Sequence, residues 1–247
     1  MANFLPLKNY ILFCLDRLIE QYELNPPFLD IGCGVGDVSR HVAAKGWHGK
    51  AIDISPEAVA LANKELSEHE NISVELKSLY QEDSHFQTIF VFDVLEHLKD
   101  DVGALEKISS LLDHGGKAVI TVPSNPREWR WDDEFYGHFR RYTKCELSEK
   151  LRAAQLCPVV FWDFTYPVFW FMRRAYTRLK KKPKDLPCDM TARTQASSMV
   201  NSWDIPLLAP LLSRDFILWK KIYLMQFNRH KEKVEKGHEM IVLAEKL

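Results

Sequence analysis

A glycine-rich stretch, FLDIGCGVGDVSR at residues 28–40, constrains the fold of this chain more than any other feature. Gly32, Gly34 and Gly36 fall within five residues, directly behind a short, mostly apolar run. Because glycine has no Cβ atom, such a turn lets a ligand approach the main chain and meet amide groups at the start of a helix. The stretch therefore predicts a strand, a ligand-binding turn and a helix, in that order.

The pattern around this stretch predicts an α/β fold. Apolar runs and helical patterns alternate from Pro27 to about Leu156, which is typical of strand–helix units on a mostly parallel sheet. Between them, Ser55 and Pro56 form a helix start, and Thr143 with Glu146 forms a capping box. Seven strands are predicted, at residues 28–32, 49–54, 72–78, 88–94, 117–123, 158–164 and 238–246.

Four segments follow from this alternation. An amphipathic helix occupies residues 1–24, and the α/β core spans 25–164, including a long aromatic loop after Pro123. Residues 165–237 break the alternation and are interpreted as a helical, aromatic and basic insertion that covers the substrate. The final core strand, 238–247, is predicted to close the sheet.

Charge and cysteine content exclude several classes of function. The net charge of −1 over 247 residues lacks the basic excess that binding to a phosphate backbone requires, so nucleic acid is an unfavoured partner. Five separate cysteines without a CxxC pair indicate neither a disulfide framework nor a zinc site, and no metal is predicted. We expect a cytoplasmic protein, with peripheral contact at the inner membrane surface left open.

The spacing of the glycines distinguishes between two classes of ligand. A dinucleotide-binding fingerprint, G-x-G-x-x-G, would place its third glycine at position 37, where the chain has Asp37. The spacing is G-x-G-x-G instead. Asp53 ends the second predicted strand, where its two oxygens can accept the hydroxyl groups of a ribose. A nucleoside is therefore still expected.

At this point the chain resembles the class I S-adenosylmethionine-dependent methyltransferases, in which an acid and an apolar residue precede G-x-G-x-G. The stretches VFDVLEHLKDD (91–101), LLDHGGKAVITVP (111–123) and GHFRRYTKCELSEKLRAAQL (137–156) add to the likeness. The resemblance covers about residues 25–160 and the final strand. It implies a Rossmann-like, doubly wound, seven-stranded and mostly parallel sheet with an antiparallel last strand, and S-adenosylmethionine as cofactor with S-adenosylhomocysteine as product.

The resemblance also implies a set of cofactor-binding positions. The glycine turn would frame the methionine part, Asp53 would hold the ribose, and Ile54 would pack on the adenine. Where family members often have an acid beside the adenine, this chain has Ser78. The implied residues are Asp30, Gly32, Cys33, Gly34, Gly36, Asp53, Ile54, Ser78, Leu79, Phe92 and Asp93.

Three residues are candidates for the chemistry itself. His97 lies near the predicted substrate side of the cofactor, and a histidine is suited to remove a proton near neutral pH. His138 and Tyr142 lie on the aromatic loop. The alternative interpretation of all three is structural, with the loop residues tying the loop to the helix below it.

The sequence leaves the methyl acceptor open, beyond the expectation that it is small or lipid-like and partly apolar. Seven cations and no acid occupy residues 173–184, a pattern that suits either an anionic membrane surface or a solvated helix over the active site. Two further alternatives remain: a non-catalytic cofactor-binding scaffold that docks at a membrane or an acidic partner, and a nicotinamide-dependent oxidoreductase. Oligomeric state is not indicated.

Overall fold

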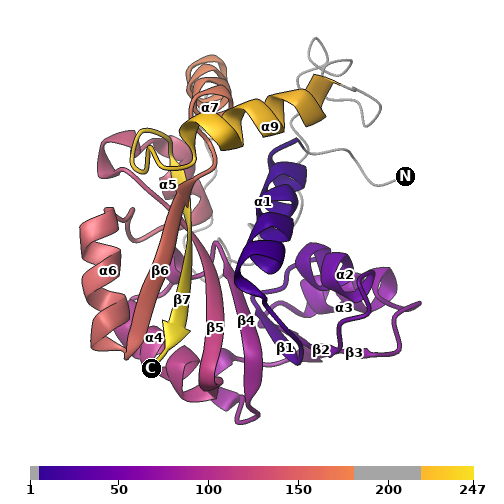
Figure 1. Ribbon diagram of the computed structural model, residues 1–247. Helices are drawn as coiled ribbons and strands as arrows, with labels where there is room; N and C mark the ends of the chain where they lie inside the picture. Colours follow the sequence, from indigo (N-terminus) through magenta and orange to yellow (C-terminus); the bar gives the residue numbers. More distant parts are fainter. Residues whose placement is uncertain (1–5, 181–217) are drawn as a thin grey trace.

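The computed structural model describes residues 6–180 and 218–247 (Figure 1). Its centre is a seven-stranded sheet in the order β3-β2-β1-β4-β5-β7-β6, in which only β7 runs antiparallel to its neighbours. The strands are β1 (Phe28–Ile31), β2 (Gly49–Asp53), β3 (Ile72–Leu76), β4 (Phe86–Phe92), β5 (Leu112–Pro123), β6 (Leu156–Asp163) and β7 (Glu239–Lys246).

The helices cover both faces of this sheet. The α-helices are α1 (Pro6–Tyr22), α2 (Asp37–Ala43), α3 (Pro56–Glu65), α4 (Asp101–Leu111), α5 (Trp131–Tyr136), α6 (Lys144–Ala153), α7 (Val168–Leu179) and α9 (Leu218–His230). Short 3-10 helices are η1 (Leu79–Gln81), η2 (Leu95–His97) and η3 (Pro126–Glu128). The predicted α/β class, the seven strands and the antiparallel last strand are confirmed.

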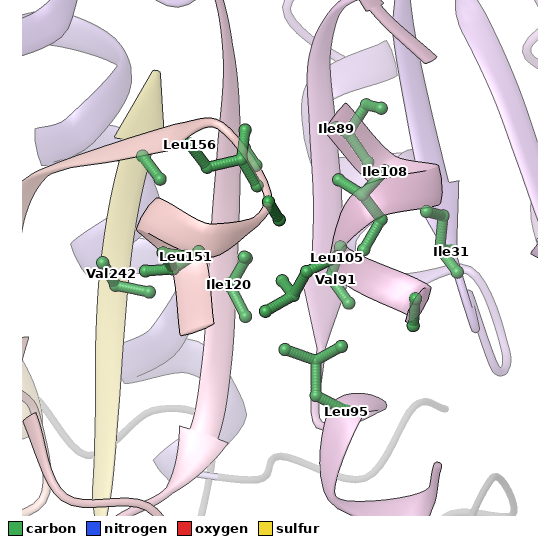
Figure 2. Close-up of a cluster of buried hydrophobic side chains, with 14 of the residues drawn as sticks. Ile31, Ile89, Val91, Leu95, Leu105, Ile108, Ile120, Leu151, Leu156 and Val242 are labelled. Carbon is green, nitrogen blue, oxygen red and sulfur yellow. The ribbon is translucent and has the colours of Figure 1, made fainter. Parts of the chain in front are cut away.

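Alternating side chains of the strands divide the core into two layers. In β4, Ile89 and Val91 face the layer under α4 and α6, whereas Phe90 faces the layer under α1, α7 and α9. Figure 2 shows the first layer, where Leu105 of α4 and Leu151 of α6 lie over the sheet. Both faces of a largely parallel sheet are thus removed from water, as this architecture requires.

The described parts of the insertion pack against the first helix. Tyr10 of α1 stacks on Phe169 of α7 and on Tyr223 of α9, with ring centroids 5.6 and 4.9 Å apart. The Tyr223 hydroxyl also donates to the Pro6 carbonyl at 2.7 Å. The first helix and the described parts of the insertion therefore share one aromatic cluster.

Two local predictions need correction. The aromatic loop after Pro123 contains η3 and α5, because Asn125 and the Arg130–Asp133 pair cap these short helices. The last strand, β7, lies between β5 and β6, which leaves β6 at the edge of the sheet. Among the described residues, none of the helices has the length and apolarity needed to span a bilayer.

Candidate cofactor and acceptor site

The turn between β1 and α2 requires its glycines. Gly32, Gly34 and Gly36 have φ angles of 66°, 55° and 83°, a region that residues with a Cβ atom rarely adopt. A Cβ atom on Gly32 would lie 2.5 Å from a methyl carbon of Val94. Gly36 is the N-cap of α2. The turn therefore leaves bare backbone at the carboxyl end of β1, which is where ligands bind in open α/β sheets.

Asp53 at the end of β2 is bound to this turn. One of its oxygens accepts the Gly34 amide hydrogen at 2.9 Å, and the other accepts that of Ser55 at 2.8 Å. The side chain is almost fully buried. Each carboxylate oxygen can accept more than one hydrogen bond, so Asp53 keeps the capacity to accept from the hydroxyl groups of a ribose. Asp53 also has a structural task that the sequence pattern did not indicate.

Asp30 lies beneath the same turn. Its Oδ2 accepts a hydrogen bond from the Ser39 hydroxyl at 2.6 Å, which links β1 to α2. Burial raises the pKa of Asp30 to about 7, although the Ser39 hydrogen bonds oppose that shift. Asp30 also lines the cavity described below. Its carboxyl group can therefore order the turn and face a ligand at the same time.

A cavity of about 320 Å³ opens beside the glycine turn. One wall consists of the turn and α2, and another of Lys8, Ile11 and Leu12 from α1. The opposite side carries the end of β4 and parts of the aromatic loop. The remaining residues that line it are Asp30, Gly32, Cys33, Gly34, Val35, Asp37, Val38, Phe92, Asp93, Glu96, Pro123, Tyr136, His138 and Glu239.

Asp93 follows β4 in an uncommon backbone conformation. Its φ angle is 55°, and it is held there by Thr121 of β5, whose hydroxyl donates to the Asp93 carboxylate at 2.8 Å. The residue is exposed where it lines the cavity, and desolvation by the surrounding protein raises its pKa. A non-glycine residue in the left-handed region costs free energy and persists only where the surrounding structure holds it there. Such residues are concentrated at functional sites.

The other predicted cofactor residues lie at the ends of β2 and β3, outside the cavity wall. The Ile54 side chain is 48% exposed, so it can pack on a flat ligand. The Ser78 hydroxyl accepts the Tyr80 amide hydrogen and caps η1, and Leu79 is buried in the core. The cavity therefore unites the residues predicted for the methionine part, whereas those predicted for the adenosine part border an open surface.

The acceptor side of the cavity contains acids that sequence reasoning did not select. Glu96 is fully buried, and neither of its carboxyl oxygens has a hydrogen-bond partner among the described residues. Burial, followed by the Asp93 charge, raises its pKa well above the ordinary value. Glu239 at the start of β7 shows the same direction of shift, mainly through desolvation. Glu239 was not predicted because it lies far from the motifs in the sequence. It reaches the cavity because β7, at the far end of the chain, enters the sheet.

The two candidate histidines meet at Glu96. Their ring centroids are 4.9 Å apart, and the Nε2 atoms of His97 and His138 lie 3.9 and 4.0 Å from Glu96 Oε1. Burial lowers the pKa of His97 to about 3, and the neighbouring His138 adds to the shift. Only His138 lines the cavity, while His97 lies behind it.

Asp133 of α5 organises the loop that carries His138. Its Oδ1 lies 3.0 Å from His138 Nδ1 and 2.6 Å from an Arg141 nitrogen. Its Oδ2 accepts a hydrogen bond from Arg173 of α7 at 2.9 Å. Burial opposes ionisation of Asp133, but the hydrogen bond to His138 and the Arg141 charge outweigh it and lower its pKa. The carboxylate thus joins the aromatic loop to the covering helix.

Tyr142 is placed away from the cavity. It is fully buried in the layer under α4 and α6, and its hydroxyl donates to Asp101 at 2.8 Å. Arg140 also bonds to Asp101, at 2.7 Å. The sequence prediction of a chemical role for Tyr142 is therefore replaced by a structural one, because the hydroxyl faces the start of α4 rather than the ligand space.

The basic tract is partly neutralised inside the protein. Arg173 is buried and pairs with Asp132 and Asp133, and Arg174 pairs with Glu128. Arg178 and Lys180 remain exposed. The tract beyond Lys180 lies outside the described residues. The cations in the first half of the tract thus hold α7 to the aromatic loop.

The geometry places a glycine turn, its anchor Asp53 and a cavity at the carboxyl ends of the strands of an α/β sheet. A comparison with known families agrees: residues 7–159 match a family model described as a methyltransferase domain. This match covers more than half of the chain, and the protein belongs to that family.

Two curated relatives match part of the chain. The chain is 32% identical over 108 residues to a ubiquinone biosynthesis O-methyltransferase from Aeromonas salmonicida, covering 41% of this chain and 45% of that one. It is 35% identical over 100 residues to phosphoethanolamine N-methyltransferase 2 from Caenorhabditis elegans, covering 38% and 23%. The chain therefore matches less than half the length of these two relatives.

The fold is shared more widely than the sequence. A crystal structure of magnesium protoporphyrin IX methyltransferase from Synechocystis PCC 6803 with bound SAM superposes with a TM-score of 0.55 at 12% identity. The match covers 97% of this chain and 79% of that one. At this identity the likeness shows the fold, which is Rossmann-like, and leaves the substrate to be argued from the site.

Proposed function

We propose that the protein transfers a methyl group from S-adenosylmethionine to a small, partly apolar acceptor, leaving S-adenosylhomocysteine. The observation that carries this proposal is the glycine turn with positive φ angles, anchored by Asp53, at the mouth of the 320 Å³ cavity. Membership of the methyltransferase-domain family supports it. The accepting atom is not assigned, since the two relatives named above are an O- and an N-methyltransferase.

The donor would lie across the carboxyl ends of β1, β2 and β4. In the proposed arrangement the amides and bare backbone of Gly32–Gly34 contact the methionine part, and Asp30 and Asp93 face its ammonium group. Asp53 accepts from the ribose, and Ile54 packs on the adenine. Five acids line this space, against a single lysine, and this excess of acids suits a donor with positively charged ammonium and sulfonium groups.

The acceptor would enter from the side of Glu96, Tyr136, His138 and Glu239. The sulfonium methyl is already activated, so the main contribution of the protein is to align the two reactants in line and to exclude water. Helix α1 and the aromatic loop line the cavity and supply that enclosure, and α7 holds the loop in place through Arg173 and Arg174. His138 lines the cavity and is the imidazole proposed to contact the acceptor region.

A nicotinamide dinucleotide fits this site less well. The diphosphate of such a cofactor binds at the N-terminus of the helix after the first strand. In this chain Asp37 occupies that helix start, where its carboxylate pairs with Lys8 at 2.6 Å. A second acid, Asp30, lies under the turn. The carboxylates of Asp37 and Asp30 would repel the diphosphate, which has the same sign of charge.

Calorimetry on the full chain tests the proposed function. We expect S-adenosylhomocysteine to bind at one site per chain, and NAD to give no heat at the same concentration. Binding of NAD alone would favour the oxidoreductase alternative. Absence of any binding of S-adenosylhomocysteine at millimolar concentration would refute the proposal. Binding without methyl transfer to any acceptor class offered would favour the scaffold alternative.

We further propose that the protein is cytoplasmic and contacts an anionic membrane surface through α7 and α9. Neither helix contains an acidic residue. Apolar side chains are exposed beside cations on both, a combination that favours the interface of an anionic bilayer. These exposed residues are Phe171, Arg178, Leu179, Leu218, Lys220, Lys221 and Met225.

Sedimentation with vesicles tests this contact. The protein should pellet with vesicles that contain anionic lipid and remain in solution with vesicles of zwitterionic lipid alone. The double variant Lys220→Glu/Lys221→Glu should lose the difference, because it reverses two exposed charges. Equal behaviour with both kinds of vesicle would disprove the contact and leave the two helices as a cover.

A further inference from the structure

Three side chains of the kinds that bind metals converge on the acceptor side of the cavity. Glu96 and His97 come from η2, and His138 comes from the aromatic loop after α5. One ligand atom from each lies within 4.8 Å of the other two. The carboxylate is central, because both imidazole Nε2 atoms lie about 4 Å from Glu96 Oε1.

Glu96 lacks the partners that a buried carboxylate ordinarily has. Its oxygens accept no hydrogen bond among the described residues although the side chain is fully buried. The closest nitrogen neighbours, at 3.9 and 4.0 Å, are too far for hydrogen bonds. Burying such a group without a partner costs free energy. A cation between Glu96 and the two imidazoles would remove that cost.

Both imidazoles have the outer contacts that metal-binding histidines use. His138 Nδ1 lies 3.0 Å from Asp133 Oδ1, and His97 is hydrogen-bonded to the Gly137 backbone. A ligating histidine commonly donates its second ring N–H to a carboxylate or a carbonyl, which fixes the ring and its tautomer. With the Nδ1 hydrogen of His138 donated to Asp133, the Nε2 lone pair is directed toward Glu96.

From this arrangement we propose that Glu96, His97 and His138 bind one divalent transition-metal ion, such as Zn²⁺, Mn²⁺, Fe²⁺ or Co²⁺. Two imidazoles and a carboxylate suit these ions, whereas Mg²⁺ and Ca²⁺ prefer ligand sets made of oxygen. At metal–ligand distances of about 2.1 Å, two ligands of one ion lie roughly 3–4 Å apart. The two distances to Glu96 Oε1, 3.9 and 4.0 Å, are at the outer limit of that range, and all three ligand atoms lie within 4.8 Å of one another, so side-chain rotations that bring them closer would complete the site. The sequence prediction of no metal is thereby revised.

The position of the ion has a consequence for the acceptor, and this consequence alone rests on the proposed function. Three protein ligands leave coordination positions open, as in catalytic metal sites. Glu96 and His138 line the cavity, so an open position would face the acceptor space. The ion would then bind an acceptor oxygen and favour loss of its proton, and His138 would act as a ligand instead of the base predicted from sequence.

Titration with Co²⁺ tests the site directly on the full chain after treatment with a chelator. We expect one ion per chain with a visible absorption band typical of nitrogen and oxygen ligands. Glu96→Gln and His97→Ala should each weaken binding by about tenfold or more. The matched control is His114→Ala, which removes an exposed histidine in β5 and should leave binding unchanged.

X-ray absorption of the wild-type protein loaded with Zn²⁺ provides a measurement that needs no variant. The proposal expects two imidazole ligands on the zinc. It is overturned if the spectrum shows fewer than two, or if Glu96→Gln, His97→Ala and His114→Ala bind Co²⁺ as the wild type does. Calorimetry with S-adenosylhomocysteine in parallel separates the two proposals: binding of that ligand without Co²⁺ binding refutes only the metal site, and the reverse refutes only the proposed function.

Discussion

The two sides of the cavity are built in different ways. The donor side is made within one short part of the chain, since the turn at residues 32–36 and its anchor Asp53 belong to consecutive strand–helix units. The acceptor side is assembled from four distant segments that contribute Glu96, Asp133, Arg173 and Glu239. On the donor side, backbone conformation defines the site, whereas on the acceptor side buried charge does.

This difference indicates which part of the site is tied to the fold. The donor turn uses features that any member of the family needs at the end of β1, where parallel strands leave a crevice for a ligand. The acceptor side depends on α5, α7 and the start of β7, which come from separate parts of the chain. A change on the donor side should therefore abolish donor binding, and a change on the acceptor side should alter the acceptor or the ion.

The largest effect is expected for Gly34→Val. A β-branched residue is strained at φ 55°, and relief of that strain would move the amide that donates to Asp53. Calorimetry should detect no binding of S-adenosylhomocysteine. The matched control is Gly46→Val, at φ 82° but with nothing within 4 Å of the added Cβ. That variant should be less stable by about 1–3 kcal/mol from backbone strain and keep its affinity. Equal affinity in the two variants would show that the turn does not bind the donor.

A smaller effect on donor binding is expected for substitutions of Asp53. Comparing two of them separates the anchoring of the Gly34 amide from the contact with the ribose. Asp53→Ala removes both oxygens and should weaken binding of S-adenosylhomocysteine by about tenfold or more, equivalent to about 1.4 kcal/mol. Asp53→Asn keeps one carbonyl oxygen for the Gly34 amide and should lie between wild type and alanine. Asp83→Ala, at a side chain that is 90% exposed, provides the control.

Unchanged affinity in Asp53→Ala would contradict the ribose assignment. If Asp53→Asn matched the wild type while Asp53→Ala lost affinity, the anchoring of Gly34 would explain the whole effect, and no contact with the ligand would be needed.

The same division explains how much of the protein could be predicted from its sequence. Gly32, Gly34, Gly36 and Asp53 were recognisable because chain-local patterns, a glycine spacing and a strand end, determine their conformation. Glu96 is the neighbour of His97 in the sequence. Its burial without a hydrogen-bond partner results from packing, which the spacing of residues in the sequence does not reveal.

Asp133 and Glu239 were missed for the same reason. The contact of Asp133 with Arg173 joins residues 40 positions apart, and Glu239 reaches the cavity only because β7 inserts between β5 and β6. Tyr142 shows the opposite error. Its place in a motif suggested chemistry, whereas its buried hydroxyl bonds to Asp101 at the start of α4.

The smallest effect is expected for Tyr142→Phe, which tests that structural role. The change removes one buried hydrogen bond, but the Oδ2 atom of Asp101 keeps Lys150 and Arg140 as partners, so it is not left isolated. Unfolding in urea should show a loss of about 1 kcal/mol, the usual net value of one hydrogen bond. Affinity for S-adenosylhomocysteine should not change. Tyr80→Phe, at a half-exposed ring, should cost less than about 0.5 kcal/mol. A loss of methyl transfer with unchanged stability would return Tyr142 to the chemistry and would place the acceptor on the α4 side of the loop.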